Sequence, residues 1–409
     1  MDELKRHLAN FLSTRQQEMV DFCARLVQTP SVNGQHPERP VAELIAAEAR
    51  RLGLPAQLVA DHEQRPNVIV STGDSGSTGL LLVGHTDTVP PGDAANWSHP
   101  PFSAHIAEGR LYGRGAIDNK GGIAAALYAL AALKAEPEFR GQAQFIGVPD
   151  EESGATGTLG VKCLTREGLL NAVGAIYVYP GLDQIPLGHR GLVRCKLLTR
   201  GVAAHTGSAG QVGRESPGRN AVTALAALLL ALEQTELPRS QLEYFDQFHA
   251  VVTPGTVISG GTAINIVPDT TEALVDIRTI PEFDRPEAEA LLKATIDRIE
   301  QGRPGILFEY ELLNHLPAAM SYPGAPLFAA LQRAARAVIG FTPELTVCGP
   351  ANEGYLFIEQ GIPIVCGFGP TGANAHAVDE YVNLASLRDA ALIYALTALE
   401  MEREVGSRE

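Results

Sequence analysis

The sequence has little of what marks a secreted, disulfide-stabilised protein. Its 409 residues include only five cysteines, an odd number, and no two of them have the C-x-x-C spacing. This argues against a disulfide framework and against a thiolate zinc site. We expect the cysteines to be buried, unreactive thiols, at positions 23, 163, 195, 348 and 366.

Long apolar runs are also missing, and positive charge is in the minority. No run has the length of about 18 apolar residues that a membrane span needs, and the longest, 221–232, is typical of a buried helix. The net charge of −15 argues against nucleic acid and anionic membranes as partners, but it leaves a small anionic substrate open. The first residues lead into an amphipathic pattern, so we expect no signal peptide and a cytoplasmic protein.

The first part of the chain alternates short apolar runs with helical patterns. We predict strands at 56–60, 67–71, 80–83, 144–148 and 175–178, a hairpin turning at Glu108-Gly109, and helices at 2–28, 40–52 and 123–134. Strands that alternate with helices predict an α/β domain, with its site at the carboxyl edge of a mostly parallel sheet.

The pattern changes after Pro186 and returns near residue 306. Between them we predict strands at 187–199, 251–259 and 264–278 and helices at 217–233 and 284–301. Long strands with two helices are typical of a compact α+β domain. We therefore predict an α/β catalytic domain with a mixed sheet in two segments, 1–186 and 304–409, and an inserted α+β lid at 187–303.

Polar residues follow the predicted strands at once. His85 and Asp87 come after the run 80–83, and on an extended backbone they point to the same side. A carboxylate that accepts one ring N–H leaves the other imidazole nitrogen free to bind a metal. A strand end with two ordinary polar residues is the alternative.

Further acidic and imidazole residues lie at other strand ends, namely Asp118, Glu151, Glu152 and His376. Nitrogen and carboxylate ligands together suit zinc, with manganese or cobalt as substitutes. The adjacent Glu151 and Glu152 repel each other unless a cation compensates, and a solvated acidic turn is the alternative. The repulsion would be relieved if one glutamate binds a cation as a ligand and the other acts as a general base on a water.

Three stretches resemble successive metal-site motifs of one metallopeptidase family, at 84–90, 113–122 and 150–154. The family includes the aminoacylases, acetylornithine deacetylase, succinyl-diaminopimelate desuccinylase and glutamate carboxypeptidase. The resemblance continues in order through 188–191, 204–205, 265–269, 276–278 and 375–376. It implies a metallopeptidase catalytic domain whose inserted lid commonly dimerises.

The resemblance also implies a ligand set. Asp118 would bridge two cations and be followed by a cis peptide bond. His85, backed by Asp87, would bind the first cation, and Glu152 and His376 would bind the second.

Four further residues would act on the substrate, and a fifth would lie near it. Glu151 would be the base that takes a proton from water and passes it to the leaving nitrogen. His205, from the lid, would reach a substrate oxygen, in many family members across a dimer interface. Asn265 and Arg278 would help to bind the substrate's carboxylate, a task that suits an arginine fork. Glu353 falls where the family often has an acidic residue near the substrate.

One position departs from the family. Tyr179 stands where Glu or Asp usually precedes proline and completes the first cation's ligands, and a neutral phenol is a poor ligand. Asp183 is close in sequence, but whether it reaches the site is open. We therefore keep one and two ions per chain as alternatives.

The expected activity is metal-dependent hydrolysis of an amide C–N bond in a small carboxylate-bearing molecule, such as an N-acyl amino acid or small peptide. A first alternative is an aminohydrolase with a single labile metal that replaces an aryl amine by hydroxyl, on a nitroanthranilate-like substrate. A second is a non-catalytic binding protein. We expect a homodimer or higher homo-oligomer.

Overall fold

A computed structural model describes residues 2–73, 78–154, 156–208 and 217–406. The chain divides into two compact units, of which the first comprises Met1–His189, Met320–Cys348 and Asn352–Glu409. The second unit comprises Arg190–Ala319 and Gly349–Ala351. None of the helices among the described residues is long and apolar enough to cross a membrane.

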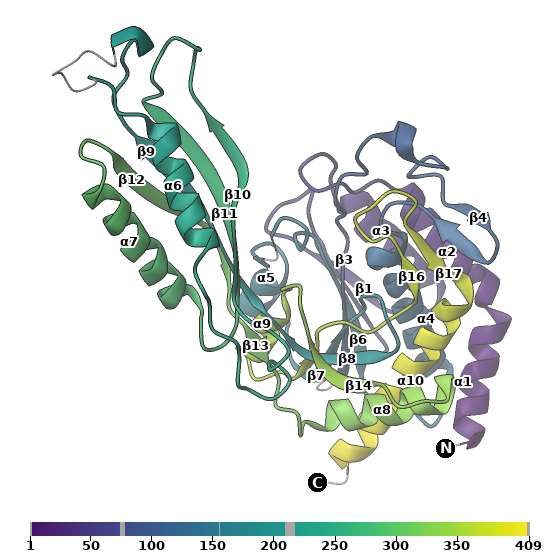
Figure 1. Ribbon diagram of the computed structural model, residues 1–409. Coiled ribbons are helices and arrows are strands. Elements are labelled where there is room, and N and C mark those ends of the chain that lie inside the picture. Colours follow the sequence, from purple (N-terminus) through teal and green to yellow (C-terminus); the bar gives the residue numbers. More distant parts are fainter. Residues whose placement is uncertain (1, 74–77, 155, 209–216, 407–409) are drawn as a thin grey trace. The chain divides into compact units, whose positions relative to one another are not determined.

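A six-stranded mixed sheet forms the centre of the first unit (Figure 1). Its order is β1 (Ala56–Val59), β2 (Asn67–Ser71), β6 (Ala143–Val148), β3 (Thr78–His85), β7 (Ala172–Tyr177) and β15 (Ile364–Val365). The last four pair in parallel, whereas β1 and β2 pair antiparallel at one edge. The predicted α/β class with a mixed sheet is confirmed, and the carboxyl ends of β3, β6 and β7 meet at one edge.

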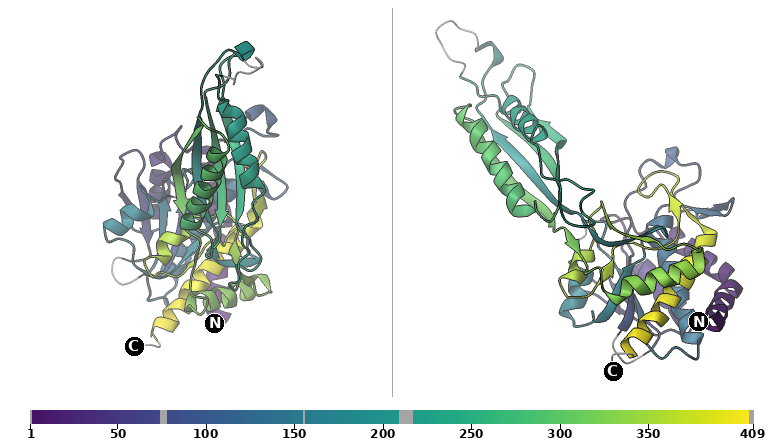
Figure 2. Two further views of the ribbon diagram at one scale, coloured as in Figure 1. Left: turned by 60° about the vertical axis from the view of Figure 1, so that its left-hand side comes forward. Right: turned by 60° about the horizontal axis from the view of Figure 1, so that its bottom comes forward.

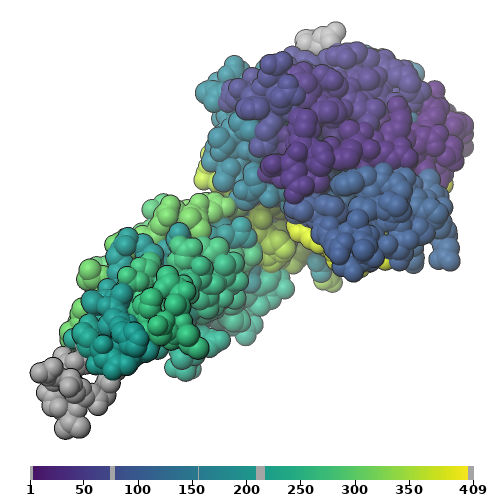
Figure 3. All heavy atoms as spheres, turned by 90° about the horizontal axis from the view of Figure 1, so that it is seen from above, coloured from purple at the N-terminus to yellow at the C-terminus, as the bar shows by residue number. Residues whose placement is uncertain are grey.

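Helices cover this sheet. The central one is α4 (Gly121–Ala135), which is buried from Gly121 to Leu133 because its alanines allow close approach on several sides. It packs against β6, α1 (Asp2–Thr14), α2 (Gln16–Gln28) and α10 (Leu384–Gly406). The other helices of the unit are α3 (Arg39–Arg51) over β1 and β2, α8 (Pro326–Ile339) on α10, and the short α5 (Val161–Arg166) and α9 (Gly354–Ile358). In Figure 3 the N-terminal part of the chain, purple and blue, forms much of this unit's visible surface.

Two small sheets complete the first unit. One has the order β13 (Ala319–Met320), β8 (Gln184–His189), β14 (Glu344–Cys348), and the other has the order β16 (Gly372–Ala373), β17 (Tyr381–Asn383), β5 (Arg110–Tyr112), β4 (His105–Ala107). The predicted hairpin is confirmed, since β4 and β5 turn at Glu108 and Gly109, both with positive φ. The second small sheet links the loop after β5 to the loop after β16.

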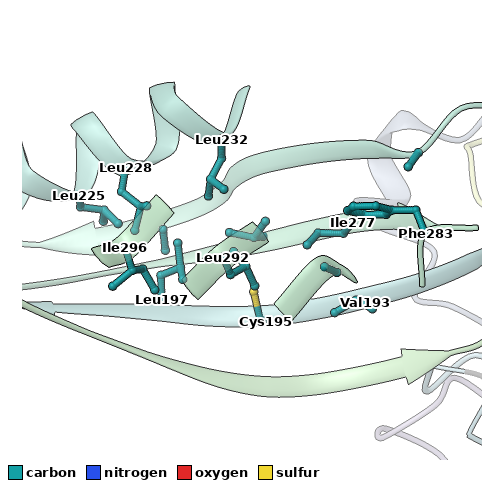
Figure 4. Packing of buried hydrophobic residues seen from close by; sticks show 14 of the residues in the cluster. Val193, Cys195, Leu197, Leu225, Leu228, Leu232, Ile277, Phe283, Leu292 and Ile296 are labelled. Carbon is teal, nitrogen blue, oxygen red and sulfur yellow. The ribbon is translucent and has the colours of Figure 1, made fainter. Parts of the chain in front are cut away.

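The second unit is a four-stranded antiparallel sheet with two helices on one face (Figure 2). The order is β10 (Val251–Gly260), β11 (Thr270–Thr279), β9 (Gly191–Arg200), β12 (Leu307–Leu316), and the helices are α6 (Ala221–Glu233) and α7 (Arg285–Gln301). Leu225 and Leu228 of α6 and Leu292 of α7 meet Cys195 and Ile277 of the sheet (Figure 4). The strict alternation of buried residues along β11 follows from this one-sided cover.

Several predicted boundaries were wrong. The stretch 187–199 is two strands, because the chain leaves one sheet at His189 and enters another at Gly191. The stretch 264–269 precedes β11 and is largely exposed rather than paired in the sheet. The helix predicted from 217 begins at Ala221, after Asn220 caps it by accepting from the Thr223 amide at 3.1 Å. The second unit extends to Ala319, beyond residue 303, because β12 pairs with β9.

Candidate metal centre

The first part of the centre is His85, the last residue of β3, which is 1% exposed. Its Nδ1 lies 2.8 Å from the backbone oxygen of Asp87 and 3.5 Å from the Asp87 carboxylate. The backbone oxygen is therefore the nearer partner of the ring, whereas the sequence pointed to the carboxylate. That contact leaves Nε2 to face Asp118 Oδ1 at 3.0 Å.

The Asp87 carboxylate connects two other segments to this strand end. Its Oδ2 accepts hydrogen bonds from Asn33 Nδ2 at 2.7 Å and from the Glu152 backbone amide at 3.0 Å. The buried side chain thereby fixes the backbone of the loop after β6 beside His85. Asn33 was not recognised in the sequence, because a single amide in a loop gives no pattern.

Asp118 lies in the glycine-rich loop before α4, and the peptide bond to Asn119 is cis, as the resemblance implied. The buried Glu380 holds this loop. Its Oε1 accepts from the amides of Ile117 and Asp118 at 3.0 and 3.1 Å, and its Oε2 accepts from the Gly115 amide and from Arg114. Glu380 and Arg114 were not recognised in the sequence, because a single charged residue in a polar loop resembles any solvated residue.

His376 completes the cluster from a turn in which it has φ 63°. Its Nε2 lies 3.1 Å from Glu152 Oε1 and 3.3 Å from Asp118 Oδ2. The two oxygens of Asp118 therefore face two imidazoles, one on each side. Residues from four segments far apart in the sequence meet at this carboxylate.

The donor set suits a divalent cation. Ligand atoms of His85, Asp118 and Glu152 all lie within 4.8 Å of one another. Two atoms bound to one tetrahedral zinc at 2.0–2.1 Å lie about 3.3 Å apart, close to the separations of 3.0–3.3 Å found here. Imidazole nitrogens with carboxylate oxygens fit zinc, manganese or cobalt.

The pKa values of the two imidazoles also favour positive charge at this position. Hydrogen bonds to Asp118 and Glu152 raise the pKa of His376 to about 10. Burial alone would lower the pKa of His85, but hydrogen bonds to Asp118 and Asp87 raise it well above its usual value. The clustered carboxylates thus hold positive charge on both imidazoles, and a bound cation would supply that charge in their place.

Glu151 lies beside this cluster. Burial raises the pKa of Glu151 to about 8, and the neighbouring charge of Glu152 adds to the rise although His85 opposes it. Burial raises the pKa of the nearby Tyr179 well above its usual value, and the charge of Glu151 adds to the rise; the Tyr179 ring lies 5.6 Å from that of His85 between centroids. Tyr179 is therefore a neighbour of His85.

The candidates in the second unit are arranged differently. His205 and Asn265 are exposed and adjacent, since the Thr206 amide donates to the Asn265 backbone oxygen at 3.0 Å. Arg278 lies at the other end of β11, where its Nε donates to Asp276 Oδ1 at 2.7 Å. Arg278 is eight residues along β11 from Thr270, where the strand begins, a distance of about 26 Å. The structure brings His205 and Asn265 together but separates both from Arg278 within one chain.

Comparisons with known proteins show similarity over most of the chain. Residues 81–400 match the family described as peptidase family M20/M25/M40. The succinyl-diaminopimelate desuccinylase of Methylobacterium radiotolerans is 31% identical over 383 residues, which cover 90% of this chain and 93% of that protein.

Two solved structures share the fold. The aminopeptidase PepT from Bacillus cereus has a TM-score of 0.74 at 22% identity, covering 95% of this chain and 99% of its own. The di-peptidase Dug1p from Saccharomyces cerevisiae has a TM-score of 0.78 at 16% identity, covering 98% of this chain and 99% of its own.

Proposed function

Because the chain belongs to peptidase family M20/M25/M40 and is a metal-dependent hydrolase of C–N bonds, we propose that it hydrolyses the amide bond of an N-acyl amino acid or small peptide with a free carboxylate. The observation that carries this proposal is the convergence of His85, Asp118 and Glu152, whose ligand atoms lie within 4.8 Å of one another. The desuccinylase relative, named for removing a succinyl group, supports an N-acyl substrate. We also propose a cytoplasmic location.

In this proposal His85, Asp118, Glu152 and His376 hold one or two divalent cations, as zinc, manganese or cobalt. The bound ion would polarise the substrate's carbonyl and lower the pKa of a water. Asp87 supports the arrangement through the His85 ring and the Glu152 amide. The remaining chemistry falls to side chains that are not ligands.

Glu151 is the proposed general base. The water oxygen attacks the amide carbon, and the water's proton passes to the Glu151 carboxylate. Glu151 then gives the proton to the amide nitrogen as the C–N bond breaks, so that an amine and a carboxylic acid form, and the acid releases the second water proton to solvent and becomes a carboxylate. A cation nearby favours the ionised form of Glu151 and counteracts the burial that raises its pKa.

The second unit supplies the proposed substrate contacts. His205 donates to the developing oxyanion, and Asn265 and Arg278 bind the substrate's carboxylate. Because Arg278 lies at the opposite end of β11 from the loop that carries Asn265, we propose that His205 and Asn265 act on the site of a second copy. The edge strand β10 supports a homodimer, since Val257 and Ile258 are 55% and 58% exposed there.

A second candidate is hydrolysis of an aryl amine, as on a nitroanthranilate-like substrate. Tyr179 supports it, because a site without the usual carboxylate at this position has diverged from its relatives. Such a substrate also offers a carboxylate to an arginine and an electron-poor carbon to an activated water.

A substrate panel separates the two candidates. Wild-type protein loaded with manganese, cobalt or zinc would be assayed against N-succinyl and N-acetyl amino acids, dipeptides and aminobenzoates. Turnover of an N-acyl amino acid or dipeptide that Glu151→Ala abolishes supports amide hydrolysis. Turnover of aminobenzoates alone favours the aryl amine, and no turnover of any amide with any of the three ions contradicts the proposed function.

A further inference from the structure

The turn that carries Glu151 and Glu152 has no regular structure of its own. Residues 149–154 follow β6 and form neither helix nor strand, so contacts with other segments must fix their backbone. On one side of Glu151 the Glu152 amide donates to Asp87 Oδ2 at 3.0 Å. The other side is held by the segment just before β2, which pairs antiparallel with β6 and therefore begins where β6 ends.

Arg65 makes the first contact from this segment. Its Nη2 donates to the backbone oxygen of Pro149 at 2.6 Å. The same guanidinium is bound by Glu38 through two hydrogen bonds, from Nε to Oε2 at 2.7 Å and from Nη2 to Oε1 at 2.9 Å. A bidentate pair fixes the plane of the guanidinium, so Glu38 determines the direction in which Arg65 meets the turn.

Glu38 is completely buried. Its side chain is 0% exposed, whereas that of Arg65 is 23% exposed. A buried ion pair is often no more stabilising than apolar packing, because both charges lose their hydration. Another ion pair reaches the same segment without such burial, since the exposed Arg166 binds Asp61 at 2.6 Å. Stability alone therefore gives little reason to bury Glu38, and the bond to Pro149 is what distinguishes its arginine.

Asp150, the residue before Glu151, is held from the same segment. Its Oδ2 accepts from the Leu159 amide at 2.8 Å, and the Leu159 backbone oxygen accepts from Asn67 Nδ2 at 2.7 Å. Asn67 is buried and begins β2. The backbone around Glu151 is therefore held by two side chains of one segment, Arg65 and Asn67, while its carboxylate is left for the reaction.

We propose that Arg65, oriented by Glu38, is a positioning residue that fixes the turn after β6 and so places the Glu151 carboxylate for proton transfer. This inference rests on the proposed function, because it takes Glu151 as the base. In this role Arg65 acts through the backbone of Pro149 and not on the substrate. Since a displacement of about 1 Å at a reacting group can lower a rate by about 10²-fold, loss of the contact should lower kcat and leave KM unchanged.

Two variants weaken the contact in different ways. Arg65→Lys keeps a positive charge beside Glu38 but loses the planar group that bridges to Pro149, and Glu38→Gln keeps its size but loses the charge that orients Arg65. With Mn²⁺ in excess and below the lowest melting temperature, we expect kcat on an amide substrate to fall by about tenfold to a hundredfold in Arg65→Lys, and by less in Glu38→Gln, at unchanged KM. The ion content after dialysis should stay at the wild-type value, because Asp87 still holds Glu152.

Each variant has a matched control elsewhere in the first unit. Arg166→Lys changes the exposed ion pair in the same way as Arg65→Lys changes the buried one. Glu48→Gln removes another buried carboxylate, in α3, which Arg25 and Arg51 bind at 2.7 Å. Both controls should keep the wild-type kcat. If the buried pair served stability alone, Glu38→Gln would match Glu48→Gln in kcat as well as in melting temperature.

A double-mutant cycle tests whether Arg65 acts through Glu151. In Glu151→Gln the base is gone, so adding Arg65→Lys should cause little further loss of kcat. An independent structural defect would instead multiply the two losses.

A wild-type kcat in both Arg65→Lys and Glu38→Gln, an equal loss of kcat in Glu48→Gln, or multiplied losses in the double variant would overturn the inference. Loss of the retained ion in Arg65→Lys would also overturn it, because the contact would then support a ligand and not the base. Any of these results beside a wild type that hydrolyses amides contradicts the inference alone, whereas a wild type without amide turnover contradicts the proposed function and the inference with it. If Arg65→Lys does not fold, Glu38→Gln and Glu48→Gln still decide.

Discussion

The two units hold their candidate residues in opposite ways. In the first unit His85 is buried, and the Asp118 loop is held by hydrogen bonds that its amides donate to the buried Glu380. In the second unit His205 and Asn265 are exposed and held by local backbone contacts. A fixed donor set suits chemistry that needs its groups placed in advance. Exposed residues suit contacts that form only when a substrate or a second chain arrives.

The largest effect should come from the first unit. Glu151→Gln removes the proposed base at unchanged size, so kcat should fall by about 10³-fold. The retained ion count should stay at the wild-type value, because Glu151 is not a proposed ligand. Glu152→Gln is the matched control and should lose the ion as well as activity. Equal ion loss in both variants would refute the separation of base and ligand.

A smaller loss is expected from the second unit. His205→Ala should lower kcat by about 10²-fold, since one oxyanion donor is removed, and should leave ion content and melting temperature unchanged. Mixing this variant with Glu151→Gln tests whether the residue acts across chains. Mixed dimers would contain one site with both wild-type groups, so up to about a quarter of wild-type activity should return. No recovery after subunit exchange would place His205 in its own chain's site.

Arg278 should affect binding more than turnover. Arg278→Lys keeps the charge but loses the planar fork, and KM for a carboxylate-bearing substrate should rise about tenfold with little change in kcat. Arg194→Lys is the control, because Arg194 also bonds to Asp276, at 2.9 Å, from the neighbouring strand. An equal rise in KM in both variants would mean that the shared Asp276 network, rather than the Arg278 fork, is responsible.

The smallest effect concerns stability and pH. Burial raises the pKa of Glu353 well above its usual value, as do the charges of Asp150 and Glu151. Above about pH 4.3 the unfolded chain loses this proton while the folded chain keeps it, so folding stability falls as the pH rises toward the folded-state pKa.

Glu353→Gln removes that dependence. The melting temperature of Glu353→Gln minus that of wild type should therefore increase by a few degrees as the pH is raised from 5 to 7. The exposed Glu344, at the start of β14, provides the control variant Glu344→Gln, whose difference from wild type should stay constant. A constant difference for Glu353→Gln as well would show that Glu353 is ionised in the folded protein.

Much of the first unit could be predicted from local patterns. Apolar runs that end abruptly in His85-Thr86-Asp87 or in Asp150-Glu151-Glu152 mark strands and the edge at which they end. Parallel strands then bring those ends together. The supports of the same site could not be predicted, because Asn33, Arg114 and Glu380 act through contacts between distant loops.

The second unit was harder to predict for a different reason. Asn265 and Arg278 are close in sequence, and both were expected to bind one carboxylate. Their separation depends on β11 running the length of an antiparallel sheet, from the pairing of Thr270 with Arg200 to that of Thr279 with Gly191. Strand register is set by cross-strand packing, which a single sequence does not display.

The most direct test of the central account is anomalous diffraction from crystals grown with Mn²⁺. We predict a peak whose ligands within about 2.0–2.3 Å come from His85, Asp118, Glu152 and His376, with the Glu151 carboxylate outside that distance. A peak coordinated by Glu151, or no peak among the four proposed ligands, would contradict it.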